Sequence, residues 1–130
     1  MPKVLISDKL SPAAVEIFRA RGIETEGKTG LSPAELRAII GDYDGLAIRS
    51  ATKVTAELLA VARNLKVVGR AGIGVDNVDV KSATARGVVV MNTPHGNAIT
   101  TAEHAIALMF ALARQIPEAS VSTKAGKWEK

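Results

Sequence analysis

The sequence contains no cysteine and very few aromatic residues. The absence of cysteine from all 130 residues excludes a disulfide framework, a thiol nucleophile and a thiolate metal site. Aromatic residues make up 3% of the chain, so side chains that could stack on nucleic-acid bases or on a flavin ring are scarce. The longest apolar run, Ala105–Ala113, is far shorter than the ~20 residues that a membrane-spanning helix needs. We therefore expect neither a nucleic-acid partner nor a membrane partner.

Clustered charge and catalytic histidine patterns are also missing. The net charge is +4, but the basic residues are scattered apart from three lysines near the end, as on an ordinary protein surface. The two histidines, His95 and His104, have no cysteine or paired carboxylate at metal-ligand spacing, so we expect no metal site. Ser7 and Ser50 have no histidine base nearby in the sequence, which gives no basis for a nucleophilic triad. The first residues lack a signal-peptide layout, and we expect a cytoplasmic protein.

The sequence does contain a regular alternation of short apolar strands and capped helices. Ser11-Pro12 and Ser32-Pro33 each place a serine at a helix N-cap and a proline at the first helical position. Alternating strands and helices imply parallel β-α-β units and the α/β class. Right-handed crossovers then favour a flavodoxin-like, doubly wound parallel sheet of five strands. The expected strands are Lys3–Ser7, Ile23–Glu26, Asp44–Ile48, Lys66–Gly69 and Val88–Met91.

The pattern changes near residue 97. We expect residues 1–97 to form the sheet domain and residues 98–130 to form a separate segment, with a helix over residues 100–116. This helix is apolar on every side, which is typical of a helix that is buried all round. We therefore expect it to lie at an interface between domains or between the subunits of a homo-oligomer.

The candidate site lies where the third and fourth strands end. Residues 67–79, VVGRAGIGVDNVD, lead from a strand into a glycine-rich loop whose backbone N–H groups can face an anion. Ligands of open α/β sheets bind beyond the carboxyl ends of the strands. Because neighbouring parallel strands end at the same edge, Arg49 and Ser50 should lie close to Arg70. Two guanidinium groups, a hydroxyl and loop N–H groups predict an anion pocket.

Other interpretations of these residues remain open. The loop could be a turn that only reverses the chain, and the arginines could pair with acids such as Asp8 or Asp76. The order Gly69, Gly72, Gly74 reads G-x-x-G-x-G and is not the G-x-G-x-x-G of a dinucleotide site. A receiver-like signalling module is the alternative from another class. It would need an acid pair after the first strand and an aspartate after the third, where this chain has Asp8-Lys9 and Arg49-Ser50.

Three motifs together resemble one enzyme family. IRSATKVTAELL, VVGRAGIGVDNVD and NTPHGNAITTAE, in this order, are similar to the N-terminal part of the D-isomer-specific 2-hydroxyacid dehydrogenases. The resemblance covers essentially the whole chain. It implies a flavodoxin-like substrate-binding domain, followed by the first helix that crosses into a nucleotide-binding domain.

The resemblance also implies an activity and a set of site residues. The implied reaction is the NAD-dependent oxidation of a phosphorylated 2-hydroxy acid, 3-phospho-D-glycerate to 3-phosphohydroxypyruvate, in serine biosynthesis. A dehydrogenase of the glyoxylate or hydroxypyruvate reductase type is the alternative. The family positions that line the substrate cleft match Arg49, Ser50, Arg70, Gly72, Ile73 and Asn97. Those that approach the nicotinamide match the backbone of Ile73 and the hydroxyl of Thr100. The nucleotide fingerprint and the catalytic arginine, glutamate and histidine are expected beyond Lys130, so the chain alone should be an inactive fragment without catalytic residues.

Overall fold

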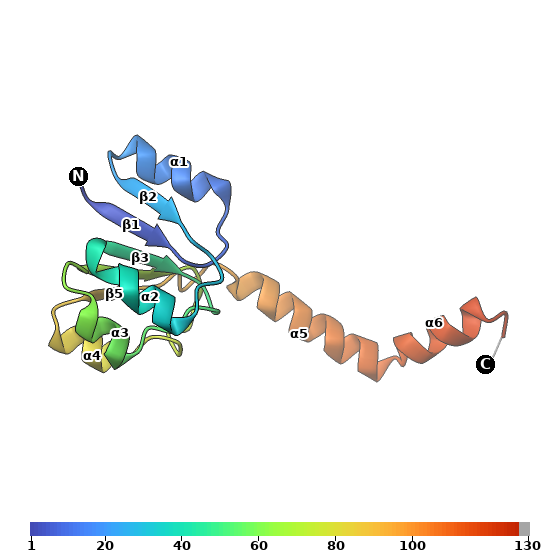
Figure 1. The fold of residues 1–130 in the computed structure, drawn as a ribbon. Coiled ribbons are helices and arrows are strands. Elements are labelled where there is room, and N and C mark those ends of the chain that lie inside the picture. The colour runs from blue at the N-terminus through green and yellow to red at the C-terminus, as the bar shows by residue number, and fades with distance from the viewer. Residues whose placement is uncertain (128–130) are drawn as a thin grey trace. The chain divides into compact units, whose positions relative to one another are not determined.

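The computed structural model describes residues 1–127 and divides the chain into two units, Met1–Gly96 and Asn97–Lys130. The first unit is a sheet of five parallel strands in the order β2-β1-β3-β4-β5 (Figure 1). The strands are β1 (Lys3–Ile6), β2 (Glu24–Gly27), β3 (Gly45–Ile48), β4 (Val67–Arg70) and β5 (Val89–Met91). This order confirms the flavodoxin-like, doubly wound α/β fold expected from the sequence.

Each α-helix of the first unit begins at a side-chain cap, whereas its 3-10 helix has none. The helices are α1 (Pro12–Ala20), α2 (Pro33–Ile39), the 3-10 helix η1 (Ile40–Asp42), α3 (Ala56–Val61) and α4 (Val80–Ala85). At α2, Ser32 and Glu35 form a reciprocal capping box, because each side chain binds the backbone N–H of the other residue. Side chains that accept a backbone N–H also precede the other α-helices of this unit; they belong to Ser11, Thr55 and Asp79.

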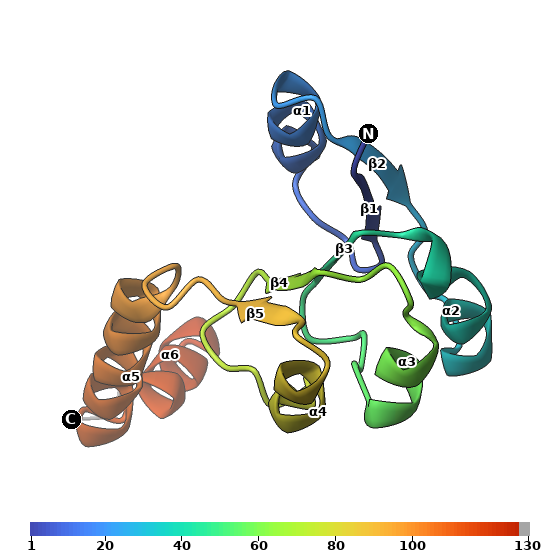
Figure 2. The ribbon, with the colours of Figure 1, turned by 90° about the vertical axis from the view of Figure 1, so that its left-hand side faces the viewer.

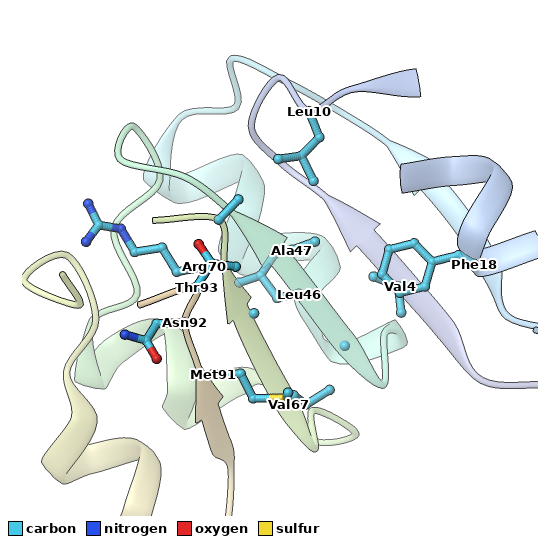
Figure 3. Close-up of a pocket in the computed structure, with 13 residues that line it drawn as sticks. Val4, Leu10, Phe18, Leu46, Ala47, Val67, Arg70, Met91, Asn92 and Thr93 are labelled. Carbon is cyan, nitrogen blue, oxygen red and sulfur yellow. The ribbon is translucent and has the colours of Figure 1, made fainter. Parts of the chain in front are cut away.

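The helices cover the two faces of the sheet unequally. Helices α2, α3 and α4 lie over one face and α1 over the other (Figure 2). The larger core cluster includes Leu5, Leu46 and Val68, and the smaller one, under α1, includes Val4 and Ala47. On the face that carries α1, an apolar groove of about 380 Å³ lies beside this helix and extends past β3 and β4 toward β5 (Figure 3).

The second unit contains two helices, α5 (Ala98–Ala113) and α6 (Ile116–Lys124). The expected helix over residues 100–116 is therefore wrong at both ends. It begins earlier, directly after Asn97, and it ends before Gln115, which adopts a left-handed φ of 50°. Pro117 has no N–H to donate back into α5 and occupies the first turn of α6 instead. No helix within residues 1–127 is long and apolar enough to cross a membrane.

Candidate functional site

The candidate site is built from two loops that leave neighbouring strands at the carboxyl edge of the sheet. The β3–β4 register pairs Ile48 with Arg70. The residue after Ile48 is Arg49, so the loop after β3 begins beside the end of β4, as the sequence predicts. The loop after β4 also donates the Ala71 N–H to the Ile48 carbonyl, at 2.9 Å. The two loops therefore form one continuous edge.

The Arg70 side chain is bound to the protein itself. Its Nε donates to the Arg49 carbonyl at 3.3 Å, and its Nη1 donates to the Gly74 carbonyl and lies 3.0 Å from the Asp76 carboxylate. The side chain is only 11% exposed, and it extends beyond the end of β4, away from Met91 (Figure 3). The structure thus shows the ion pair between Arg70 and Asp76 that the sequence offered as the alternative to ligand binding.

Arg49 has the opposite arrangement, with an anchored backbone and an exposed side chain. Its N–H donates to Asp8 Oδ2 at 2.6 Å, and its carbonyl accepts from Asn77 Nδ2 at 2.7 Å. The guanidinium makes no ion pair with any residue in the described range 1–127. The exposed side chain of Arg49 is therefore free to meet an anionic ligand, beside the exposed Ser50.

Asp8 is a residue whose role the sequence did not reveal. It follows β1, is only 6% exposed, and binds the backbone of the β3 loop rather than the guanidinium of Arg49. Burial raises the pKa of its carboxyl group. Hydrogen bonds from the Thr52 hydroxyl and from the backbone N–H groups of Arg49, Thr52 and Ala51 outweigh this, so the pKa lies below its usual value. Asp8 therefore stays ionised and is fully occupied as an acceptor.

Asn77 is the second residue that sequence reasoning missed. Its Nδ2 donates to the carbonyl of Arg49 at 2.7 Å and to the carbonyl of Thr52 at 2.6 Å. The available signals were weak: Asp8 directly follows a strand, and Asn77 lies in a segment rich in turn-forming residues. Neither signal indicates which distant loop the side chain binds.

The glycine-rich loop exposes backbone donors at this edge. Within residues 1–127, the N–H groups of Ile73 and Gly74 donate to no protein acceptor, and neither does the N–H of Ser50. The Gly72 carbonyl accepts the Thr93 N–H at 2.9 Å, which ties the loop to the segment after β5. A Cβ at Gly74 would lie 2.9 Å from Asp76 Oδ1 and 3.0 Å from Arg70 Nη1, so a side chain there would require the Arg70–Asp76 pair to shift. The edge thus combines free N–H donors with one free guanidinium, an arrangement suited to an anion.

The predicted site residues are divided between the two units. Arg49, Ser50, Arg70, Gly72 and Ile73 belong to the first unit, on the loops just described. Asn97 and Thr100 belong to the second unit, where Asn97 precedes α5 and Thr100 lies in its first turn. Both are exposed. In the described part of the chain, no group of three or more histidine or acidic side chains could hold a metal ion.

Comparisons with known proteins agree with this fold. Residues 4–127 match the sequence profile described as D-isomer specific 2-hydroxyacid dehydrogenase, catalytic domain. The D-3-phosphoglycerate dehydrogenase of Archaeoglobus fulgidus is 53% identical over 128 residues, which cover 98% of this chain and 24% of that protein. The human protein of the same name is 52% identical with the same coverage. This chain spans about a quarter of the length of the curated relatives it matches.

Solved structures with the same fold include members with related names. A protein from Pyrococcus horikoshii OT3 superposes with a TM-score of 0.86 at 32% identity, over 100% of this chain and 39% of that one. The NAD+-bound 3-phosphoglycerate dehydrogenase of Entamoeba histolytica superposes with a TM-score of 0.75 at 28% identity, over 85% of this chain and 38% of that one. With the profile match spanning residues 4–127, the chain belongs to the D-isomer specific 2-hydroxyacid dehydrogenase family, as part of its catalytic domain.

Proposed function

We propose that this chain is the substrate-binding part of an NAD-dependent D-3-phosphoglycerate dehydrogenase. The parent enzyme would oxidise 3-phospho-D-glycerate to 3-phosphohydroxypyruvate, in serine biosynthesis. The observation that carries the proposal is the identity of 46–53% to proteins named D-3-phosphoglycerate dehydrogenase, over 98–100% of this chain. The exposed edge with its free guanidinium and free N–H donors is consistent with a doubly anionic substrate.

In this proposal the chain binds and orients the substrate. The Arg49 guanidinium offers a planar fork to a carboxylate or a phosphate. The N–H groups of Ser50, Ile73 and Gly74 add neutral donors. Arg70 contributes through the loop that it ties together rather than as a free charge. The general base would come from outside this chain, because the buried carboxylate at this edge, Asp8, accepts hydrogen bonds from three donors and the exposed one, Asp76, is paired with Arg70.

The cofactor would contact this chain at few residues. From its resemblance to the family, the chain would approach the nicotinamide through the backbone of Ile73, whose N–H has no protein acceptor within residues 1–127, and through the hydroxyl of Thr100, in the first turn of α5. NAD, when bound, accepts the hydride from the substrate carbon. The chain contains no G-x-G-x-x-G fingerprint for the phosphates of the dinucleotide. We place that fingerprint in the nucleotide-binding domain of the parent, which residues 98–130 would begin.

We further propose that the parent enzyme is a cytoplasmic homo-oligomer with α5 at an interface. Helix α5 carries large apolar side chains that are exposed in the described chain: Leu108 (52%), Met109 (61%), Phe110 (64%) and Leu112 (78%). Apolar groups of this size gathered on one helix are typical of an interface.

The substrate assignment can be tested on this chain by NMR. The isotope-labelled chain is titrated with 3-phospho-D-glycerate and, separately, with glyoxylate. We expect the phosphorylated acid to shift the amide signals of Arg49, Ser50 and Gly72–Gly74, and Arg49→Ala to weaken its binding. Arg19→Ala, on the exposed surface of α1, is the matched control. Equal affinity for glyoxylate would instead support the glyoxylate or hydroxypyruvate reductase alternative, which is represented by a Sinorhizobium meliloti structure at 30% identity and a TM-score of 0.79.

A further inference from the structure

Two side chains hold the loop between Arg49 and Thr52 by its backbone. The Asp8 carboxylate accepts the Arg49 N–H at 2.6 Å and the Thr52 N–H at 3.2 Å. The Asn77 carboxamide donates to the carbonyl of Arg49 at 2.7 Å and to the carbonyl of Thr52 at 2.6 Å. The same two loop residues are therefore bound through both their donors and their acceptors.

The two side chains are themselves anchored in rigid parts of the first unit. The residue before Asp8, Ser7, donates its N–H to the Ala47 carbonyl at 3.1 Å, which continues the β1–β3 ladder. The backbone carbonyl of Asn77 accepts the Val54 N–H at 2.8 Å, where Val54 and Val78 form an isolated parallel bridge. Asp8 and Asn77 therefore form a clamp on the loop. Asp8 connects the loop to the central strand pair, and Asn77 connects it to the segment before α4.

A hydroxyl chain completes the acceptor side of the clamp. The Thr52 hydroxyl donates to Asp8 Oδ1 at 2.6 Å, so the Ser7 hydroxyl, 2.8 Å away, donates to Thr52. Ser7 is 3% exposed and Asp8 is 6% exposed. A buried carboxylate whose donors are all supplied by one loop favours a single arrangement of that loop, because any other arrangement leaves the charge without partners.

We propose that Asp8 and Asn77 are positioning residues, which together hold the Arg49–Thr52 loop in the conformation that presents Arg49 and Ser50 to the anionic substrate. Neither side chain needs to touch the substrate. This inference rests on the proposed function, because it assigns the substrate to this edge. Between the two clamped residues, the loop has no regular secondary structure of its own. Without the clamp, substrate binding would also have to order the loop, at a cost in conformational entropy.

The test uses two nearly isosteric variants, Asp8→Asn and Asn77→Asp. Asp8→Asn places an N–H donor opposite the backbone N–H groups of the loop. Asn77→Asp places a carboxylate opposite the backbone carbonyl oxygens of the loop. The matched control is Asp44→Asn. Asp44 also accepts a backbone N–H, from Lys3 at 2.9 Å, but precedes β3 and so lies at the opposite edge of the sheet.

Two readouts are compared in the whole chain. Amide hydrogen exchange at Arg49 and Thr52 should accelerate about tenfold or more in both clamp variants and remain unchanged in Asp44→Asn. The affinity for 3-phospho-D-glycerate should fall about tenfold in the clamp variants and remain unchanged in the control. In the unmodified chain, the chemical shift of the Arg49 amide proton should change with pH as Asp8 titrates. This coupling requires the hydrogen bond from the Arg49 N–H to the Asp8 carboxylate.

Conservative replacements at Thr52 keep the test decisive if Asp8→Asn fails to fold. Thr52→Ser retains the hydroxyl that donates to Asp8 and should keep both readouts, whereas Thr52→Val should reproduce the loss. Unchanged affinity in folded Asp8→Asn and Asn77→Asp would overturn the inference. If the unmodified chain does not bind 3-phospho-D-glycerate, the proposed function fails. The exchange rates at Arg49 and Thr52 then still decide whether the clamp holds the loop.

Discussion

Replacing Arg70 with alanine should destabilise the fold, whereas replacing Arg49 should not. Arg70 holds the carbonyl of Gly74 and, at 3.3 Å, the carbonyl of Arg49, with a side chain that is 11% exposed. A hydrogen bond to a charged group contributes about 1.5–3 kcal/mol. The Asp76 side chain is 84% exposed, so its ion pair with Arg70 adds only about 0–1 kcal/mol. Counting one full bond, one long bond and a screened ion pair, we expect Arg70→Ala to cost about 2–4 kcal/mol.

Urea unfolding of the whole chain, followed by circular dichroism, measures this cost. The Arg49 guanidinium is exposed and makes no ion pair in the described chain, so Arg49→Ala should change the free energy of unfolding by less than about 0.5 kcal/mol. The same variant should weaken binding of 3-phospho-D-glycerate by about tenfold to a hundredfold. Asp76→Ala, which removes only the screened partner, is the control for Arg70. If Arg70→Ala leaves the stability unchanged, the guanidinium does not tie the loop, and our division of roles between the two arginines is refuted.

Three further predictions concern the cofactor, α5 and Glu26. Calorimetry should detect no tight binding of NAD to this chain, because it lacks the dinucleotide fingerprint; a micromolar dissociation constant would contradict this. In sedimentation equilibrium, the chain should self-associate and a version ending at Asn97 should not, because burying each large apolar side chain of α5 contributes about 1.5–3 kcal/mol. Monomeric behaviour of the longer chain at high micromolar concentration would exclude α5 as the interface. The Glu26 carboxylate accepts from Lys28 at 2.8 Å, Lys3 at 2.9 Å and the Tyr43 hydroxyl at 2.7 Å, and these bonds lower its pKa from 4.5 to about 2. Its stabilising contribution is therefore complete above pH 4.5 and is lost as the pH falls through 2, so the urea midpoint of Glu26→Gln should approach that of the unmodified chain in acid; a gap that does not depend on pH would contradict this.

The sequence by itself determined the α/β class, the order of the elements and the edge that carries the candidate site. These features depend on interactions between residues that are close in the chain. The Ser32 cap binds Glu35 three residues away, and the alternation of strands and helices restricts the sheet to few topologies. The prediction that the loops after β3 and β4 adjoin followed from the same rule, since neighbouring parallel strands end at one edge.

Only the tertiary structure decided which side chains hold that edge together. Asp8 binds residues 41 and 44 positions later in the chain, and Asn77 binds residues 28 and 25 positions earlier. Such partners come together only when the strands pair, so no local pattern in the sequence can identify them. The same reason applies to Arg70: its residue type is compatible with binding a ligand or an acid of its own loop. The folded geometry shows the acid of its own loop, with Asp76 3.0 Å from its guanidinium, while the binding of a ligand by Arg70 stays a prediction.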